Sequence, residues 1–82
     1  MKATVLVRPK QGILDPQGQA VERALPALGF TGVRNVHVGR LIELDVEAFD
    51  AGDARSQVER MCEQLLANPL IESYEIAVGD GG

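Results

Sequence analysis

The chain has 82 residues, the length of one small domain, and a formal net charge of −4. Its basic residues do not cluster and its only aromatic residues are Phe30, Phe49 and Tyr74, so nucleic-acid binding is not expected. The single cysteine, Cys62, excludes an internal disulfide, and no apolar run approaches the roughly 20 residues needed to span a bilayer. We therefore expect a cytoplasmic protein. Because a domain of this size buries only a marginal core, we also expect it to oligomerise.

The N-terminal half predicts a strand followed by a helix. Residues 3–8 (ATVLVR) are rich in β-branched side chains, which are typical of a strand. After a loop, Asp15 is the expected N-cap of a helix, and Pro16 suits its first position. Pro26 should distort the last turn, and Gly29 should end the helix. The helix carries one apolar stripe, made of Val21, Ala24, Leu25 and Leu28.

The C-terminal half predicts two strands, a helix and a last strand. Residues 33–47 alternate in polarity on both sides of Gly39, which indicates two strands joined by a tight turn near Gly39 and Arg40. Asp53 is the preferred N-cap of the second helix and Asp50 the alternative. Asn68 can end this helix in a left-handed conformation, and Pro69 prevents its continuation. Its apolar stripe comprises Ala54, Val58, Met61, Cys62, Leu65 and Leu66. The last strand is predicted over 70–78, the single domain over 1–78, and a flexible tail over 79–82.

The order β-α-β-β-α-β predicts an α+β, ferredoxin-like sandwich: a four-stranded, mostly antiparallel sheet with both helices on one face. The opposite face would carry a mixture of apolar and charged side chains, including Thr4, Leu6, Leu41, Glu43 and Asp45. Such a face is a candidate interface. The alternative is that these are scattered surface hydrophobic residues without a role.

Catalytic residues are not indicated by any motif. His37 is the only histidine, and a lone histidine is a weak candidate for a metal ligand. Cys62 lies on an apolar stripe, where it is expected to pack as a small hydrophobic residue. The carboxylates of Glu43, Asp45 and Glu47 share one strand face, which we interpret as a solvated surface. We therefore predict no catalytic and no metal-binding residue.

Three strings carry a family resemblance: ILDPQGQA (13–20), HVGRLIEL (37–44) and MCEQLLANPLIESYEI (61–76). In this order and spacing the chain resembles, over about residues 2–78, the PurS family, the small subunit of phosphoribosylformylglycinamidine (FGAM) synthase. It departs from the family pattern at Pro9 before Lys10, at Arg40 in place of a common lysine, and at Pro26 inside the first helix.

The resemblance implies a non-catalytic subunit of a C–N ligase complex in de novo purine biosynthesis. The complex uses ATP, Mg²⁺ and glutamine, none of them expected to be bound by this chain. The partners implied are a glutaminase subunit, a large synthase subunit and a second copy of the chain in a dimer, or in a tetramer of two dimers. The role implied is to join the other two subunits so that ammonia passes between them.

Seven residues are candidate subunit contacts: Lys10, Asp15, Gln17, Gly18, Arg40, Asn68 and Glu72. Helix capping explains Asp15 but not the glycine in the first helical turn. We expect another subunit to approach Gly18 where a Cβ would clash, so that Gly18→Ala would slightly stabilise the isolated chain. The alternative is that Gly18 eases packing within its own chain.

Two other functions remain open from the sequence. The runner-up is a small dimeric ligand-sensing module, because ferredoxin-like domains often dimerise through their sheets and bind small effectors. A free-standing enzyme would need catalysis by carboxylates alone, such as Glu43 or Asp45. The fold by itself does not decide between these functions.

Overall fold

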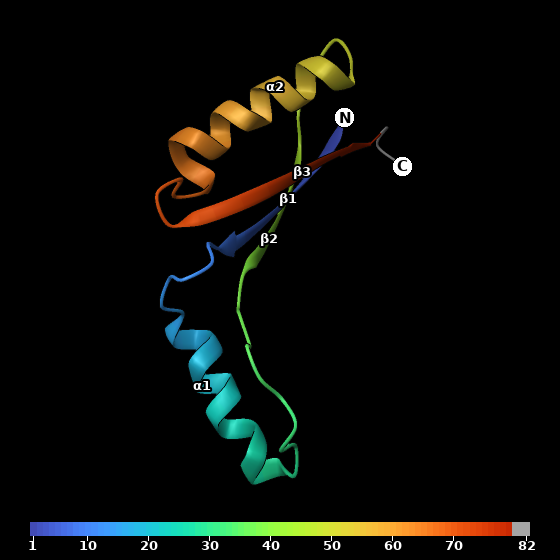
Figure 1. Cartoon of the computed structure of the whole chain (residues 1–82). Helices are drawn as coiled ribbons and strands as arrows, with labels where there is room; N and C mark the ends of the chain where they lie inside the picture. Colours follow the sequence, from blue (N-terminus) through green and yellow to red (C-terminus); the bar gives the residue numbers. More distant parts are fainter. Residues whose placement is uncertain (80–82) are drawn as a thin grey trace.

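The computed structural model describes residues 1–79, which form three strands, two α-helices and two short helical extensions (Figure 1). The elements in chain order are β1 (Lys2–Pro9), α1 (Pro16–Ala24), the 3₁₀ turn η1 (Leu25–Leu28), β2 (Arg40–Asp45), α2 (Ala51–Met61), the π-helical turn η2 (Cys62–Leu66) and β3 (Glu72–Gly79). Gly79 therefore belongs to a strand, and the rest of the expected tail lies outside the described residues. Within residues 1–79, no helix is long and apolar enough to cross a membrane.

The sheet has the order β2-β1-β3, and β1 pairs antiparallel with both neighbours. Val5 lies opposite Ile42 on one side and opposite Ile76 on the other. Because side chains alternate along a strand, this register places Val5 and its two partners on one face. The β1–β2 ladder ends where Val7 meets Arg40.

The expectation of four strands is wrong, because residues 33–38 form no strand and no tight turn precedes β2. The chain instead passes through Gly39 without a turn and enters β2 at Arg40. Gly39 passes so close to the carbonyl oxygen of Val7 that a Cβ would clash with it. Beyond this crossing β1 ends at Pro9, so residues 33–38 have no strand of their own sheet to pair with.

The core lies between α2 and one face of the sheet. Val5, Val58 and Cys62 are its largest fully buried side chains. The half-buried Ile42, Tyr74 and Ile76 pack against it. The opposite face of the sheet is uncovered, as expected, and Leu6 and Leu41 are exposed there.

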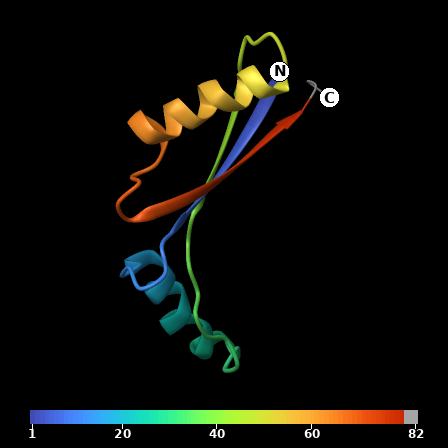
Figure 2. The same cartoon turned by 45° about the horizontal axis from the view of Figure 1, so that its top comes forward.

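Helix α1 lies beyond the end of the sheet, so the expectation of two helices on one face is also wrong. Both views show α1 and residues 31–39 side by side as an arm that projects from the sheet (Figures 1 and 2). The molecule is accordingly elongated, with extents of 51 × 29 × 14 Å. The side of α1 that faces residues 36–38 carries Gly18 and Glu22, whereas Val21 and Leu28 of the predicted stripe are exposed. The arm therefore has almost no core of its own.

The first helix ends as its sequence predicts. Asp15 is the N-cap of α1, and its side chain accepts a hydrogen bond from the backbone N–H of Gly18. Pro26 lies in the 3₁₀ turn that replaces the last turn, and Gly29 follows it with φ of +97°.

Three details of the second helix differ from prediction. Asp50 is the N-cap, and Asp53 instead accepts from the backbone N–H of Phe49. The wider π-helical turn shifts the phase of the stripe, so Leu65 is 83% exposed. Asn68 is not left-handed, because the helix ends at Ala67 in an extended conformation.

Candidate functional site

The predicted site residues meet at the junction between the arm and the sheet. Asp15, at the start of α1, is 9% exposed. Its Oδ1 accepts from the backbone N–H of Gly18 at 3.0 Å, and its Oδ2 accepts from that of Val38 at 2.7 Å. These two hydrogen bonds lower the pKa of Asp15, and His37, whose Nδ1 lies 3.7 Å from Oδ2, adds a smaller effect in the same direction. The carboxylate of Asp15 therefore holds the two segments of the arm, α1 and residues 36–38, together.

The same contact between α1 and residues 36–38 explains why a glycine is needed at Gly18. A Cβ at Gly18 would clash with the backbone carbonyl oxygen of Val36 and would lie 2.6 Å from Oδ2 of Asp15. The close approach that the sequence indicates is thus made by the chain's own backbone, as the alternative interpretation of Gly18 expects. The expectation that Gly18→Ala stabilises the isolated chain is wrong for the same reason.

Arg40 and Glu72 form an ion pair that links β2 to β3. The guanidinium of Arg40 donates from Nη1 to Oε2 of Glu72 at 2.7 Å and from Nη2 to Oε1 at 3.1 Å. Nη2 also donates to the carbonyl oxygen of Leu66 at 2.7 Å, near the C-terminus of the second helix. The hydrogen bonds from Arg40, and one from the backbone N–H of Asn68, lower the pKa of Glu72. The same pair raises the pKa of Arg40.

The loop between η2 and β3 is held by Lys10 and Asn68. Nζ of Lys10 donates to the carbonyl oxygen of Pro69 at 2.6 Å. The side-chain oxygen of Asn68 accepts from the backbone N–H of Leu70, and its carbonyl oxygen accepts from that of Glu72 at 2.7 Å. Cations beside the last carbonyl groups of a helix are electrostatically favourable, so Arg40 stabilises this helix end through its contact with Leu66.

A groove of about 340 Å³ lies between Asp15 and the Arg40–Glu72 ion pair. We call it the junction groove. It brings together Asp15, Gln17, Arg40 and Glu72 of the predicted site, whereas Lys10, Gly18 and Asn68 lie outside its lining. Its full lining is Pro9, Ile13, Leu14, Asp15, Pro16, Gln17, Val38, Gly39, Arg40, Ile71 and Glu72.

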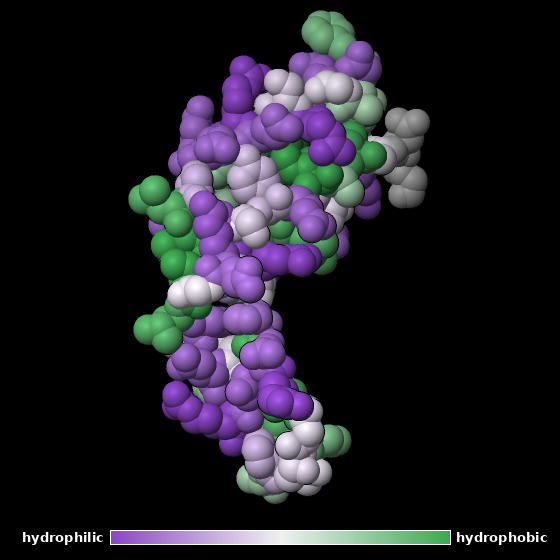
Figure 3. Space-filling model, in the orientation of Figure 1, coloured by the Kyte–Doolittle hydropathy of each residue, from purple (hydrophilic) through white to green (hydrophobic). Residues whose placement is uncertain are grey.

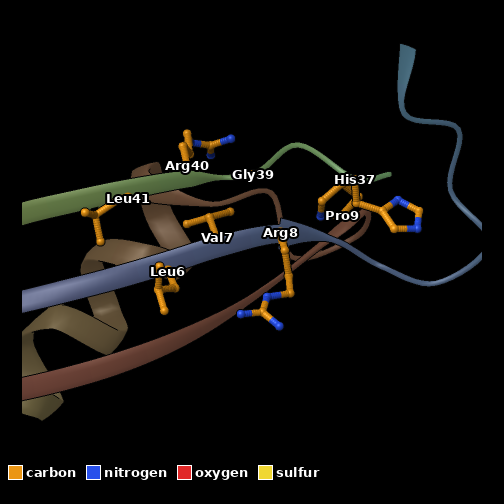
Figure 4. A pocket seen from close by; sticks show the side chains of 8 residues that line it. All are labelled: Leu6, Val7, Arg8, Pro9, His37, Gly39, Arg40 and Leu41. Carbon is orange, nitrogen blue, oxygen red and sulfur yellow. The ribbon is translucent and has the colours of Figure 1, made fainter. Parts of the chain in front are cut away.

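A second hollow, of about 520 Å³, lies on the other side of the strand crossing (Figure 4). Its side chains do not converge: Arg40 points to one side of the strands, and Leu6, Leu41 and Arg8 point to the other. His37 extends away at the far end. The arrangement does not assemble a set of polar groups around one ligand position.

The remaining candidates for chemistry have structural surroundings. Cys62 is fully buried, and burial raises the pKa of its thiol. The hydroxyl of Tyr74 donates to Oε1 of Glu63 at 2.7 Å, which raises the pKa of Tyr74 to about 12. Among residues 1–79, no group of three His, Cys, Asp or Glu side chains could hold a metal ion.

Sequence reasoning missed two contacts between α1 and residues 36–38, both made by backbone N–H groups of the latter segment. Val36 donates to Oε1 of Glu22 at 3.0 Å, and Val38 donates to Asp15. No local signal could have identified them, because they depend on the path of an extended segment that the sequence assigns to the sheet.

The fold and the junction together define a small α+β module with an arm that leaves its apolar side chains open. Comparison with known proteins makes the assignment specific. Residues 2–80 match the sequence family described as PurS: phosphoribosylformylglycinamidine (FGAM) synthase. The chain is 43% identical over 77 residues to the FGAM synthase subunit PurS of Methanocaldococcus jannaschii, with 94% of this chain and 93% of that protein covered. The chain belongs to the PurS family.

Solved structures agree with this assignment. The crystal structure of M. jannaschii PurS has a TM-score of 0.86 to this chain at 42% identity, covering 96% of this chain and 95% of that one. A chain in the structure of PurLQS from Thermotoga maritima has a TM-score of 0.83 at 34% identity, with 93% of each chain covered. The fold of this chain is therefore similar to that of both solved chains over nearly their whole length.

Proposed function

We propose that this chain is the non-catalytic small subunit of an FGAM synthase complex in purine biosynthesis, where it joins the glutaminase and synthase subunits. Family membership supports the complex, and a chain of the T. maritima PurLQS structure is similar to this one. The single observation that carries the joining role is the open arm. Its apolar side chains Val21, Leu28 and Phe30 are 42%, 71% and 57% exposed. A small chain with this much exposed apolar surface is expected to bury it against partner proteins.

The first partner in this proposal is a second copy of the chain. Residues 33–38 form no strand and have no ladder partner among residues 1–79, and β3 is an open edge. A second copy supplies both a strand and an apolar surface for the arm, which removes the exposed edge. Val21→Asp should therefore reduce the dimer, or the tetramer made of two dimers, to monomers in sedimentation analysis. Phe49→Asp, at a 98% exposed side chain outside the arm, is the control and should leave the mass unchanged.

Ammonia transfer is the second part of the proposal. The complex uses ATP, Mg²⁺ and glutamine in the cytoplasm, none of them bound by this chain, whose contribution is to hold the glutaminase and synthase sites together. The test adds the purified chain to the two other subunits from the same source, with either glutamine or an ammonium salt as nitrogen donor. Glutamine-dependent synthesis should require the chain, and ammonia-dependent synthesis should not. If neither rate changes and the chain does not co-migrate with the subunits, the proposed function is wrong and a ligand-sensing module becomes the better interpretation.

A further inference from the structure

The face of the sheet opposite α2 carries two large apolar side chains next to each other. Leu6 of β1 lies opposite Leu41 of β2, and these side chains are 41% and 54% exposed. The close-up shows that Arg8 points to the same side of the strands as the two leucines (Figure 4). We call this side, with Thr4, Leu6, Arg8, Leu41 and Glu43, the open face. The space-filling view shows that hydrophilic side chains cover most of the visible surface and that hydrophobic ones gather in separate patches (Figure 3).

Two opposite charges flank the leucines along the open face. Arg8 lies beyond them toward the arm, and Glu43 lies on their other side, opposite Thr4. Arg8 and Thr4 are four positions apart on β1, so Arg8 and Glu43 are separated by roughly 13 Å along the strands, too far for a close ion pair. Both side chains are exposed, and among residues 1–79 neither forms a hydrogen bond or an ion pair. Each charge is therefore available to a partner outside the chain.

A second copy turned end for end would supply both missing partners. With a two-fold axis across the strands at the level of Leu6 and Leu41, each leucine meets its own counterpart. Arg8 of each chain then lies over Thr4 of the other chain, next to Glu43. A copy laid in the same strand direction would place Arg8 against its own counterpart or past the end of the β1–β2 ladder. Charge complementarity therefore selects a second copy in the reversed orientation.

We propose that the open face packs against the open face of a second copy in this reversed orientation, and that the contact joins two dimers into a tetramer. The inference rests on the proposed function, in which the arm and the free edge of the sheet form the dimer. The arm, with Val21, Leu28 and Phe30, lies outside the open face, so the two contacts can form together.

The area of the open face indicates what this contact joins. Three strands and the six residue steps from Lys2 to Arg8 give a face of roughly 20 by 14 Å. Two opposed faces then cover roughly 600 Å², below the roughly 1,200 Å² at which stable interfaces begin. One contact is therefore too small to hold two monomers, which agrees with the monomers expected of Val21→Asp. A dimer offers two open faces to a second dimer, which doubles the area.

Sedimentation of the purified full-length chain tests this contact. Leu41→Asp places two carboxylates at the two-fold axis, and Phe49→Asp is the matched control at an exposed side chain outside the sheet. Arg8→Glu places a carboxylate against Glu43 of the other chain. Arg55→Glu, at an exposed position of α2, makes the same change of charge away from the open face. Thermal unfolding of each variant separates a lost contact from a lost fold.

A charge exchange tests the orientation. Glu43→Arg alone should weaken the tetramer as Arg8→Glu does, because each places like charges together across the interface. The double variant with Arg8→Glu and Glu43→Arg restores opposite charges there. Because Arg8 and Glu43 are too far apart to pair within one chain, a contact between copies is required for this rescue.

The natural chain should sediment as a tetramer. Leu41→Asp and each single charge reversal should raise the dissociation constant of tetramer into dimers by at least about tenfold, whereas both controls and the double variant should not. If the double variant does not regain the tetramer, the reversed orientation is wrong. If the natural chain remains a dimer, or Leu41→Asp leaves the tetramer intact, the open face is not an interface although the proposed function stands. If Leu41→Asp gives monomers, the open face holds the dimer itself and the arrangement proposed here is wrong. A tetramer that responds as expected but does not support glutamine-dependent synthesis would uphold the contact and contradict the proposed function.

Discussion

Replacing Gly18 with alanine tests the joint between arm and sheet. Alanine would improve helix propensity by about 1 kcal/mol. The added Cβ, however, clashes with the carbonyl oxygen of Val36 and lies 2.6 Å from Oδ2 of Asp15. Overpacking of this kind typically costs about 1–3 kcal/mol, and moving the helix to relieve it breaks the bonds of Asp15 to Gly18 and Val38. We expect a net destabilisation of about 2 kcal/mol, or a fall in melting temperature of about 8–16 °C for a chain of this size.

Gly52→Ala is the matched control for this experiment. Gly52 also lies in the first turn of a helix, but a Cβ there would meet only Oδ1 of Asp50, at an ordinary contact distance of 3.5 Å. This variant should be as stable as the natural chain or more so. Both variants are melted at the same protein concentration, because oligomerisation makes the melting temperature concentration-dependent. A Gly18→Ala variant that gains stability as Gly52→Ala does would refute the reasoning about the joint.

Three further predictions concern titration and reactivity. Ultraviolet titration of Tyr74, the only tyrosine, should give a midpoint near 12, and Glu63→Gln should move it toward the ordinary value of 10.0; an unchanged midpoint would deny the hydrogen bond. The lowered pKa of Glu72 contributes stability that is present above its ordinary pKa of 4.5 and is lost as the pH falls through the folded value. Glu72→Gln should therefore flatten the acid limb of a stability–pH curve, and an equally steep limb would argue against the pair with Arg40. The thiol of Cys62 should react with Ellman's reagent only as the chain unfolds, so rapid labelling of the native chain would contradict its burial.

Local signals predicted local structure well. Asp15 and Pro16 begin a helix, Pro26 distorts its end and Gly29 stops it, each because the residue's own backbone preferences decide the conformation. The identity of the complex came from the three strings that resemble the PurS family, because no physical pattern in the chain indicates it. Pattern reasoning alone reached an α+β chain without a catalytic motif.

Tertiary contacts decided what the sequence could not. Alternation in residues 33–38 predicts extended backbone, but it does not say whether a strand of the same chain is available for pairing. The phase of Leu65 depends on a π-helical turn, and the need for Gly18 depends on a carbonyl group 18 residues further along the chain. Arg40 and Glu72 lie on the two edge strands, so their contact depends on the register of both strands with β1.

The central claim, that this chain couples two active sites, is tested most directly by the fate of the ammonia. Glutamine consumed and FGAM formed would be measured in the reconstituted complex with and without the chain, in the presence of glutamate dehydrogenase, 2-oxoglutarate and NADH to scavenge free ammonia, with NADH oxidation counting the ammonia captured. With the chain present, FGAM formed should match the glutamine hydrolysed, and little NADH should be consumed. If the scavenger captures the ammonia equally well with and without the chain, the chain does not join the two sites and the account is wrong.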